Sequence, residues 1–190
     1  MNTRKANINN RSKYYAGIGS RQTPVYILKI MTFIAIHLEL KGYVLRSGGA
    51  PGADTAFSNG AVAKEVFVPW RGYEGFPIVY PIPNEAYTIS SKFHPQWNNL
   101  SPAVKALMAR NAMQVLGPQL NDPSEFVICW TPDGCENIKQ RTRFTGGTGQ
   151  AISIADYYNV PVYNLSKAKS VQVVSDIINK NLFTFLEHLF

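Results

Sequence analysis

The sequence predicts an α/β protein with a Rossmann-like, doubly wound sheet that is mostly parallel and carries helices on both faces. Short apolar runs alternate with amphipathic runs at helical spacing along most of the 190 residues. Three glycine-rich segments, at residues 17–21, 47–54 and 146–150, each follow a predicted strand and precede a predicted helix. Glycine permits the sharp turns that join strands to helices in such folds.

The first part of the chain alternates regularly. Residues 14–18 form a short apolar run that Gly19 follows, which predicts the first strand. Pro24 suits the first turn of a helix that continues to Leu40, and Gly42 is a stop signal. A second strand is predicted at 43–45, an alanine-rich helix at 53–64 and a third strand at 66–68.

The alternation breaks at residues 69–83, where Gly72, Gly75 and several prolines predict an irregular excursion. Its aromatic residues Trp70 and Tyr73 are candidates for stacking on a base. Residues 85–99 are expected to be partly helical, and 102–116 form a helix that Gly117 stops. A strand at 126–130, a polar loop, a helix at 147–157 and a strand at 160–164 follow, with further helices at 171–179 and 182–189.

We expect three parts: a flexible basic arm at residues 1–13, one Rossmann-like domain at 14–166, and C-terminal helices at 167–190. The last part is too apolar to stay solvated, so it packs on the domain or on a second subunit, and a homo-oligomer is expected. The sequence has no membrane-length apolar run and no signal-peptide core near Met1, which predicts a cytoplasmic protein without a membrane role.

The net charge of +7 favours an anionic partner, either a phosphorylated small molecule or nucleic acid. Cys129, Cys135 and the three histidines are not spaced as metal ligands, so no metal site is predicted. No cofactor is expected.

Ligands of parallel sheets bind beyond the carboxyl ends of the strands, where the glycine segments are expected to meet. Residues 146–149 are the best phosphate site, because a helix begins there. Arg21 and Arg110 are candidate phosphate clamps, and Asp54 is either a helix cap or a ribose ligand. The full set of candidate ligand-binding residues is Gly19, Ser20, Arg21, Ser47, Gly48, Gly49, Ala50, Asp54, Arg110, Asn111, Gly146, Gly147, Thr148, Gly149 and Gln150. The candidate acid–base carboxylates are Asp54 and Glu74.

These motifs carry a resemblance to known families. Gly19-Ser20-Arg21, the segment 47–54 and Arg110-Asn111 resemble the DNA-processing protein A (DprA/Smf) family. Residues 146–149 resemble the glycine motif of the Lonely Guy family of phosphoribohydrolases. Both belong to the SLOG superfamily of Rossmann-like nucleotide-binding domains, and the resemblance covers about residues 14–165. Small stand-alone members are frequent in phage genomes, which suggests the same origin here.

The resemblance implies different functions for the two families. Lonely Guy enzymes cleave nucleoside monophosphates with a glutamate of the motif, but Ser153 takes that position here. DprA proteins bind single-stranded DNA and a recombinase. We therefore favour a module that binds a small nucleotide or nucleotide-derived phosphorylated ligand, for sensing or sequestration. A nucleoside-monophosphate N-glycosidase and a DprA-like single-stranded DNA-binding protein remain the alternatives.

Overall fold

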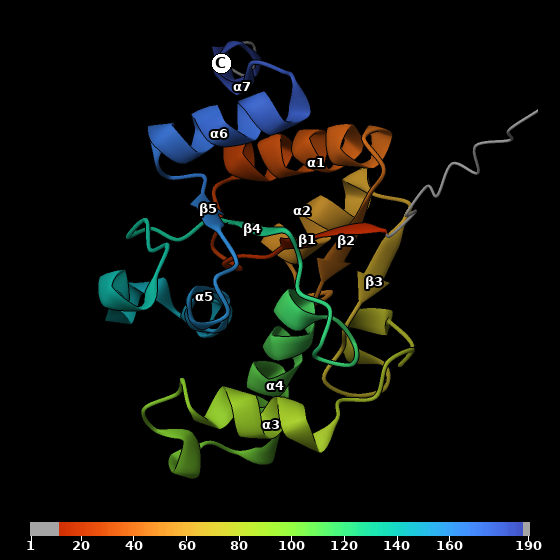
Figure 1. The fold of residues 1–190 in the computed structure, drawn as a ribbon, viewed down its shortest axis with the longest axis vertical. Coiled ribbons are helices and arrows are strands. Elements are labelled where there is room, and N and C mark those ends of the chain that lie inside the picture. The colour runs from red at the N-terminus through yellow and green to blue at the C-terminus, as the bar shows by residue number, and fades with distance from the viewer. Residues whose placement is uncertain (1–11, 188–190) are drawn as a thin grey trace, which may run out of the picture.

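The computed structural model describes residues 12–187 and contains one five-stranded, all-parallel sheet (Figure 1). The strand order is β3-β2-β1-β4-β5. The central strand β1 (Lys13–Gly17) pairs with β2 (Tyr43–Ser47) on one side and with β4 (Phe126–Cys129) on the other. The edges are β3 (Lys64–Val66) and β5 (Val162–Asn164). The predicted doubly wound α/β fold is confirmed, whereas the predicted arm lies almost entirely outside the described residues.

The two faces of the sheet are covered by different helices, because successive side chains of a strand point to opposite faces. Tyr15 joins the core beneath α1 (Val25–Leu40), α2 (Ala53–Gly60) and α6 (Ala168–Ile178). Its neighbour Ala16 joins the opposite core, beneath α4 (Pro102–Leu116) and α5 (Thr148–Tyr157). Figure 1 shows these two layers above and below the sheet.

Two shorter helices complete the layers. Helix α3 (Asn84–Ser91) packs on α4, and the hydroxyl of Ser90 donates to the Met108 carbonyl at 3.0 Å. Helix α7 (Leu182–Glu187) packs on α1, where Phe185 stacks on Phe33 with ring centroids 4.2 Å apart. The C-terminal segment therefore lies against this chain's own first helix.

The helix predicted at 53–64 is too long, and the third strand begins earlier than predicted. Helix α2 ends at Gly60, where a Cβ would lie 2.3 Å from the Thr32 carbonyl oxygen of α1. The following residues pair with β2, beginning with the bond from the Leu45 amide to the Ala63 carbonyl. Strand pairing therefore replaces the last helical turn that composition predicted. The segment at 85–99 also divides, into α3 and a separate 3₁₀ turn at Trp97–Asn99.

The order of the strands creates a switch point between β1 and β4. The chain moves from β1 outward to β2 and β3, then returns to the other side of β1 as β4. The connections at the carboxyl ends of β1 and β4 consequently leave in opposite directions and open a crevice between them. Helix α4 precedes β4 in the chain, and it forms one wall of that crevice.

Candidate functional site

A cleft of about 590 Å³ lies at this switch point, a volume in the usual range for small-molecule sites. Four segments line it: the turn after β1, the start of α2, one face of α4, and the loop that leads into α5. The predicted site residues that line it are Gly19, Ser20, Arg21, Ala50, Asp54, Arg110, Asn111, Gly146, Gly147 and Thr148. All three glycine-rich segments thus contribute to one cleft.

The other nominated residues of the second glycine segment lie behind the cleft. Ser47 is fully buried, and its hydroxyl donates to the Gly17 carbonyl at 2.8 Å, which joins the ends of β2 and β1. Gly49 has a positive φ of 68°, and a Cβ there would lie 3.0 Å from the Phe76 ring. Gly48 leaves room for the guanidinium of Arg110. These residues shape the turn and lie outside its cleft-lining part.

Gly149 and Gln150 lie inside α5, also away from the cleft. The Gln150 side chain is fully buried and donates from Nε2 to the Ser90 carbonyl at 2.7 Å. A Cβ at Gly149 would lie 2.7 Å from Nε of Arg141, so this glycine admits the arginine side chain. Both residues therefore join α5 to its neighbouring segments.

The turn after β1 presents Ser20 and Arg21 to the cleft. The Ser20 hydroxyl accepts from the Gln22 amide at 3.0 Å and so stabilises the turn. Arg21 donates from Nη2 to the Tyr73 hydroxyl at 3.0 Å. Tyr73 is itself buried, and its ring packs edge-on against Trp70. The irregular excursion thus positions an arginine of the cleft, and neither aromatic residue lines the cleft itself.

Asp54 holds the start of α2 together. Its Oδ2 accepts from the Ala50 amide at 3.3 Å and pairs with Nη1 of Arg110 at 3.4 Å. Burial raises the pKa of this carboxyl above its ordinary value, although Arg110 and the amides of Ala50 and Gly48 act in the opposite direction. Asp54 therefore acts as a turn cap and ion-pair partner in this structure.

The candidate carboxylates do not form an acid–base pair in the cleft. Asp54 is the one acidic residue among those that line it in the described chain, and Glu74 lies in the excursion with a left-handed φ of 48°. Ser153 is buried in α5, where its hydroxyl donates to the Gly149 carbonyl at 2.8 Å and accepts from Arg141 at 3.3 Å. The motif position at Ser153 is therefore occupied by a structural hydroxyl.

The loop before α5 is anchored by Asp133. Its Oδ2 accepts from the hydroxyls of Thr142 at 2.6 Å and Thr145 at 2.5 Å. Partial burial raises the pKa of Asp133, but hydrogen bonds from Thr142, Thr145 and Thr131 outweigh it and hold the pKa below its ordinary value. The ionised carboxylate thus fixes the residues that immediately precede Gly146.

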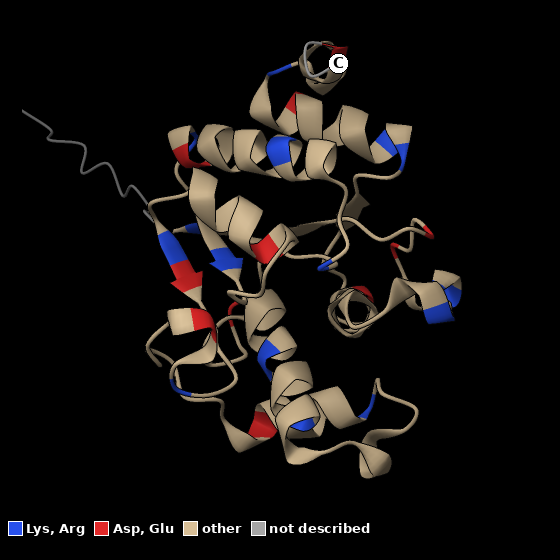
Figure 2. Cartoon of the chain, turned by 180° about the vertical axis from the view of Figure 1, so that it is seen from behind, with Lys and Arg blue, Asp and Glu red and all other residues tan. Residues whose placement is uncertain are grey.

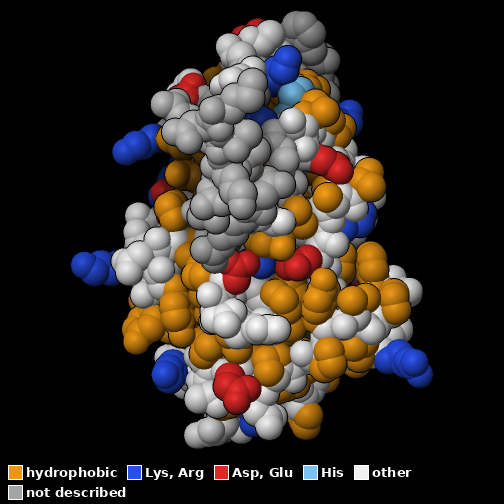
Figure 3. All heavy atoms as spheres, turned by 45° about the vertical axis from the view of Figure 1, so that its right-hand side comes forward, with side chains coloured by type: hydrophobic (Ala, Val, Ile, Leu, Met, Phe, Trp, Pro, Cys, Tyr) orange, Lys and Arg blue, Asp and Glu red, His pale blue; other side chains and the backbone are white. Residues whose placement is uncertain are grey.

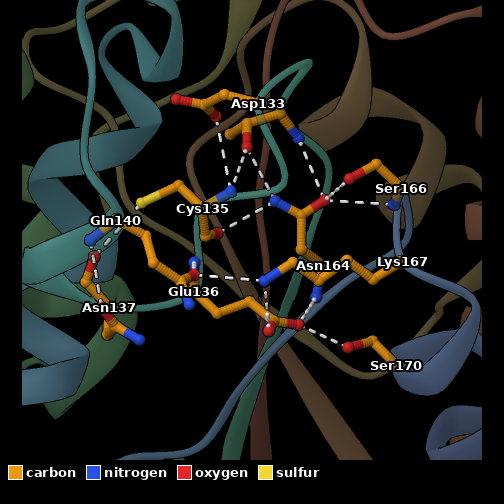
Figure 4. A network of polar contacts seen from close by, with 10 residues as sticks. Asp133, Cys135, Glu136, Asn137, Gln140, Asn164, Ser166, Lys167 and Ser170 are labelled. Atoms are coloured by element: carbon orange, nitrogen blue, oxygen red, sulfur yellow. Dashed lines mark hydrogen bonds and ion pairs between the residues drawn. The ribbon is translucent and has the colours of Figure 1, made fainter.

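A second network fixes the other end of the same loop (Figure 4). Asn164, fully buried at the end of β5, donates from Nδ2 to the Thr131 hydroxyl at 2.7 Å and to the Cys135 carbonyl at 3.0 Å. Glu136 accepts from the Asn164 amide at 3.0 Å and from Lys167 at 2.9 Å, and it also bonds the Ser170 hydroxyl. The loop after β4 is therefore joined to β5 and to the start of α6.

The anchored loop delivers the third glycine segment to the cleft. Gly146 has a positive φ of 62°, and α5 begins two residues later at Thr148. The amides of Gly149 and Gln150 bond the carbonyls of Gly146 and Gly147. The earlier amides of a helix have no carbonyl within the helix to bond, and they carry the partial positive charge of the helix N-terminus. This end of the cleft is chemically suited to an anion.

Several lining residues were not predicted, among them Gln114, Arg143 and Phe144. Gln114 lies one helical turn after Arg110 on the same face of α4, so helical periodicity from the Arg110-Asn111 motif was a usable signal. Arg143 and Phe144 lie in a loop without a periodic pattern. The guanidinium of Arg143 lies 4.7 Å from the centre of the Phe144 ring, whose side chain is 61% exposed at the rim.

Two features are absent from residues 12–187. No helix in this range combines the length and the apolar character needed to cross a bilayer. The same residues contain no group of three or more His, Cys, Asp or Glu side chains arranged to hold a metal ion.

Comparison with known proteins identifies the fold. No protein-family model and no curated protein sequence matches the chain. The structure is similar to that of DNA processing protein A from Helicobacter pylori, a protein studied for its single-stranded DNA binding mode. The similarity has a TM-score of 0.54 at 19% identity and covers 94% of this chain and 80% of the other. The chain therefore has a DprA-like Rossmann fold.

Proposed function

We propose that the cleft binds a small nucleotide or nucleotide-derived phosphorylated ligand, for sensing or sequestration. The observation that carries the proposal is the convergence of the turn after β1 and the start of α5 on one cleft of nucleotide size. The start of α5 supplies main-chain N–H groups that have no partner within the helix, and its dipole favours a phosphate there. Arg21 and Arg143 line the same cleft and add positive charge.

Gly147 offers a direct test of the phosphate position. It is exposed, it has an ordinary helical φ of −63°, and a Cβ there would approach only the Met108 methyl group, at 3.8 Å. Valine at this position should therefore fold normally while its side chain obstructs the cleft. Calorimetric titration with nucleoside 5′-monophosphates should show a loss of affinity that is small for Gly147→Ala and large for Gly147→Val. Equal affinity in the three proteins would refute this phosphate position.

A second candidate ligand is single-stranded DNA, with one of its nucleotides in the same cleft. The fold similarity to the H. pylori protein and the net charge of +7 support it. The distribution of charge favours the small ligand instead. Lys and Arg are spread over several elements in Figure 2, and on the face in Figure 3 they stand apart from one another. A groove that binds single-stranded DNA combines a continuous row of Lys and Arg side chains with aromatic side chains that stack on the bases.

The two candidates predict different dependence on salt and on ligand length. Binding of a DNA strand that contacts several phosphates weakens steeply as salt increases, because counterions are released. A mononucleotide in the cleft should show a shallow salt dependence, and lengthening it to an oligonucleotide should add little affinity. Fluorescence anisotropy with oligonucleotides at two salt concentrations, with nucleoside monophosphates as competitors, separates the two.

We propose a phage-type member of the SLOG superfamily that acts in the cytoplasm as a homo-oligomer. The glycine motifs and the Arg110-Asn111 pair support the superfamily, and they all belong to segments that line the cleft. Sedimentation analysis of the purified full chain tests the oligomeric state.

A further inference from the structure

The face of α4 that lines the cleft carries buried polar side chains inside an otherwise apolar stretch. Arg110 and Gln114 are four residues apart, so they lie one above the other on the same face of the helix. Their residues are only 7% and 1% exposed, yet both line the cleft. Neighbouring positions on the buried stretch are apolar, such as Ala112 and Met113. Polar groups at such positions require partners.

Each of these side chains contains a hydrogen-bond donor without an acceptor. Nε of Arg110 and Nε2 of Gln114 are buried, and neither bonds any atom of the described chain. Buried donors are nearly always paired in folded proteins, because an unpaired one loses its bonds to water. These two donors lie one helical turn apart in the wall of a cleft, where a ligand oxygen would supply the acceptor that both lack.

The surrounding structure explains why the chain itself does not satisfy them. The bond of Arg110 to Asp54 is made by Nη1, which leaves Nε facing elsewhere. Ser124 lies beside Gln114, but its hydroxyl donates to the main-chain carbonyl of Gln114 at 3.2 Å. The side-chain amide of Gln114 is thus not needed to close the end of α4.

We propose that Arg110 and Gln114 form a donor subsite in the wall of the cleft, which takes a ligand oxygen that carries no hydrogen. This inference rests on the proposed function and adds to it the chemistry of the ligand's second end. A guanidinium can only donate, so this subsite accepts a ligand oxygen and disfavours a ligand amino group. Because neither donor atom is exposed in this structure, each side chain must turn toward the cleft when the ligand binds. The acceptor is a keto oxygen of a base or an oxygen of a second phosphate, while the first phosphate lies at the start of α5.

Matched pairs of nucleotides distinguish these two sources. Adenosine and inosine 5′-monophosphates differ by an amino against a keto group, and adenosine 3′,5′-bisphosphate adds a phosphate to the first of them. We expect one of the two changes to increase the affinity of the wild-type protein about tenfold in calorimetric titrations. Gln114→Met, which removes the donor at similar volume, should abolish that increase, so that the variant binds both members of the pair with the same affinity.

The same variant has a second readout that needs no ligand. Because it removes a buried unpaired donor, Gln114→Met should raise the melting temperature of the free protein, whereas loss of a purely structural glutamine would lower it. Gln172→Met on the exposed face of α6 is the control for the substitution itself. A lower melting temperature together with an unchanged affinity pattern would overturn the subsite.

The outcomes separate this proposal from the proposed function. If the wild-type protein binds the three nucleotides with equal affinity, the donor subsite is refuted and the nucleotide cleft stands. If the keto group or the second phosphate increases the affinity equally in wild type and Gln114→Met, another residue recognises that group. The subsite is then also refuted. If none of the nucleotides binds, both proposals fall together.

Discussion

The guanidinium of Arg110 occupies the space that a side chain at Gly48 would need. A Cβ on Gly48 would lie 1.2 Å from Nη1 of Arg110 and 2.7 Å from Oδ2 of Asp54. The glycine is therefore required by the side chain that reaches over it from α4. The second glycine segment and the Arg110-Asn111 motif, which are far apart in sequence, are parts of one interlocked structure.

This relationship predicts a non-additive pair of substitutions. Gly48→Ala should displace Arg110 from Asp54 and lower the free energy of unfolding by about 1–3 kcal/mol, the usual cost of overpacking. In an Arg110→Ala background the same change should cost much less, because the space is then empty. Urea denaturation of the four proteins in a double-mutant cycle measures the coupling. Additive effects would show that the Arg110 side chain is not the reason why position 48 requires glycine.

The fully buried Asn164 should be among the most sensitive polar positions. Its side chain bonds Thr131, Cys135 and Ser166, so Asn164→Leu leaves several buried groups without partners. We expect a loss of about 2–4 kcal/mol in the free energy of unfolding. Denaturant titration checks this value, with the exposed Gln172→Leu as control. A loss below about 0.5 kcal/mol, typical of a surface site, would contradict the role of the network.

The lowered pKa of Asp133 should contribute to the loss of folded-state stability at acidic pH. Its pKa is lower in the folded chain than in the unfolded chain, so the unfolded state binds a proton first as the pH falls. The resulting stability is present above the ordinary aspartate pKa of about 4, and it is lost as the pH falls through the lowered pKa. Asp133→Asn should therefore flatten the decline of stability below about pH 4. Thermal melts across this range, with Asp176→Asn on α6 as control, test the sign.

Asp54, the one acidic residue that lines the cleft in the described chain, is not placed for acid–base catalysis, so bound nucleotides should remain intact. Asp54 is buried and held by Arg110 and the Ala50 amide, and Ser153 replaces the glutamate that the Lonely Guy motif would supply. Incubation of nucleoside monophosphates with the protein should release no free base, as measured by liquid chromatography. Base release that Asp54→Asn abolishes would overturn this prediction and assign the carboxylate a catalytic role.

Much of this architecture follows from local sequence. The apolar runs at β1 and β4 and the helical spacing of α1 and α4 each predict one element, and their alternation predicts the parallel sheet. The end of α2 does not follow from local sequence. The helix ends at Gly60, which packs closely against α1, a segment distant in sequence. Helix propensity carries no information about such contacts.

The candidate site divides in a similar way. Glycine turns and the arginine motif are local patterns, so Gly19, Arg110 and Gly147 could be nominated from the sequence. The anchoring of the loop by Asp133 depends on hydroxyls nine and twelve residues away in an irregular segment. Nothing periodic connects these positions. Gln114 is the lining residue that the sequence could also have predicted, because its four-residue helical spacing from Arg110 is visible there.

We propose that a nucleotide occupies the cleft between β1, α4 and the start of α5. The most direct test is an NMR titration of the isotope-labelled protein with a nucleoside 5′-monophosphate. A nucleotide bound there should cause the largest shifts at the main-chain amides of Gly147, Thr148 and Ser20 and at the side-chain amide of Gln114. Shifts confined to the separate pocket at residues 94–99, or no shifts at all, would contradict it.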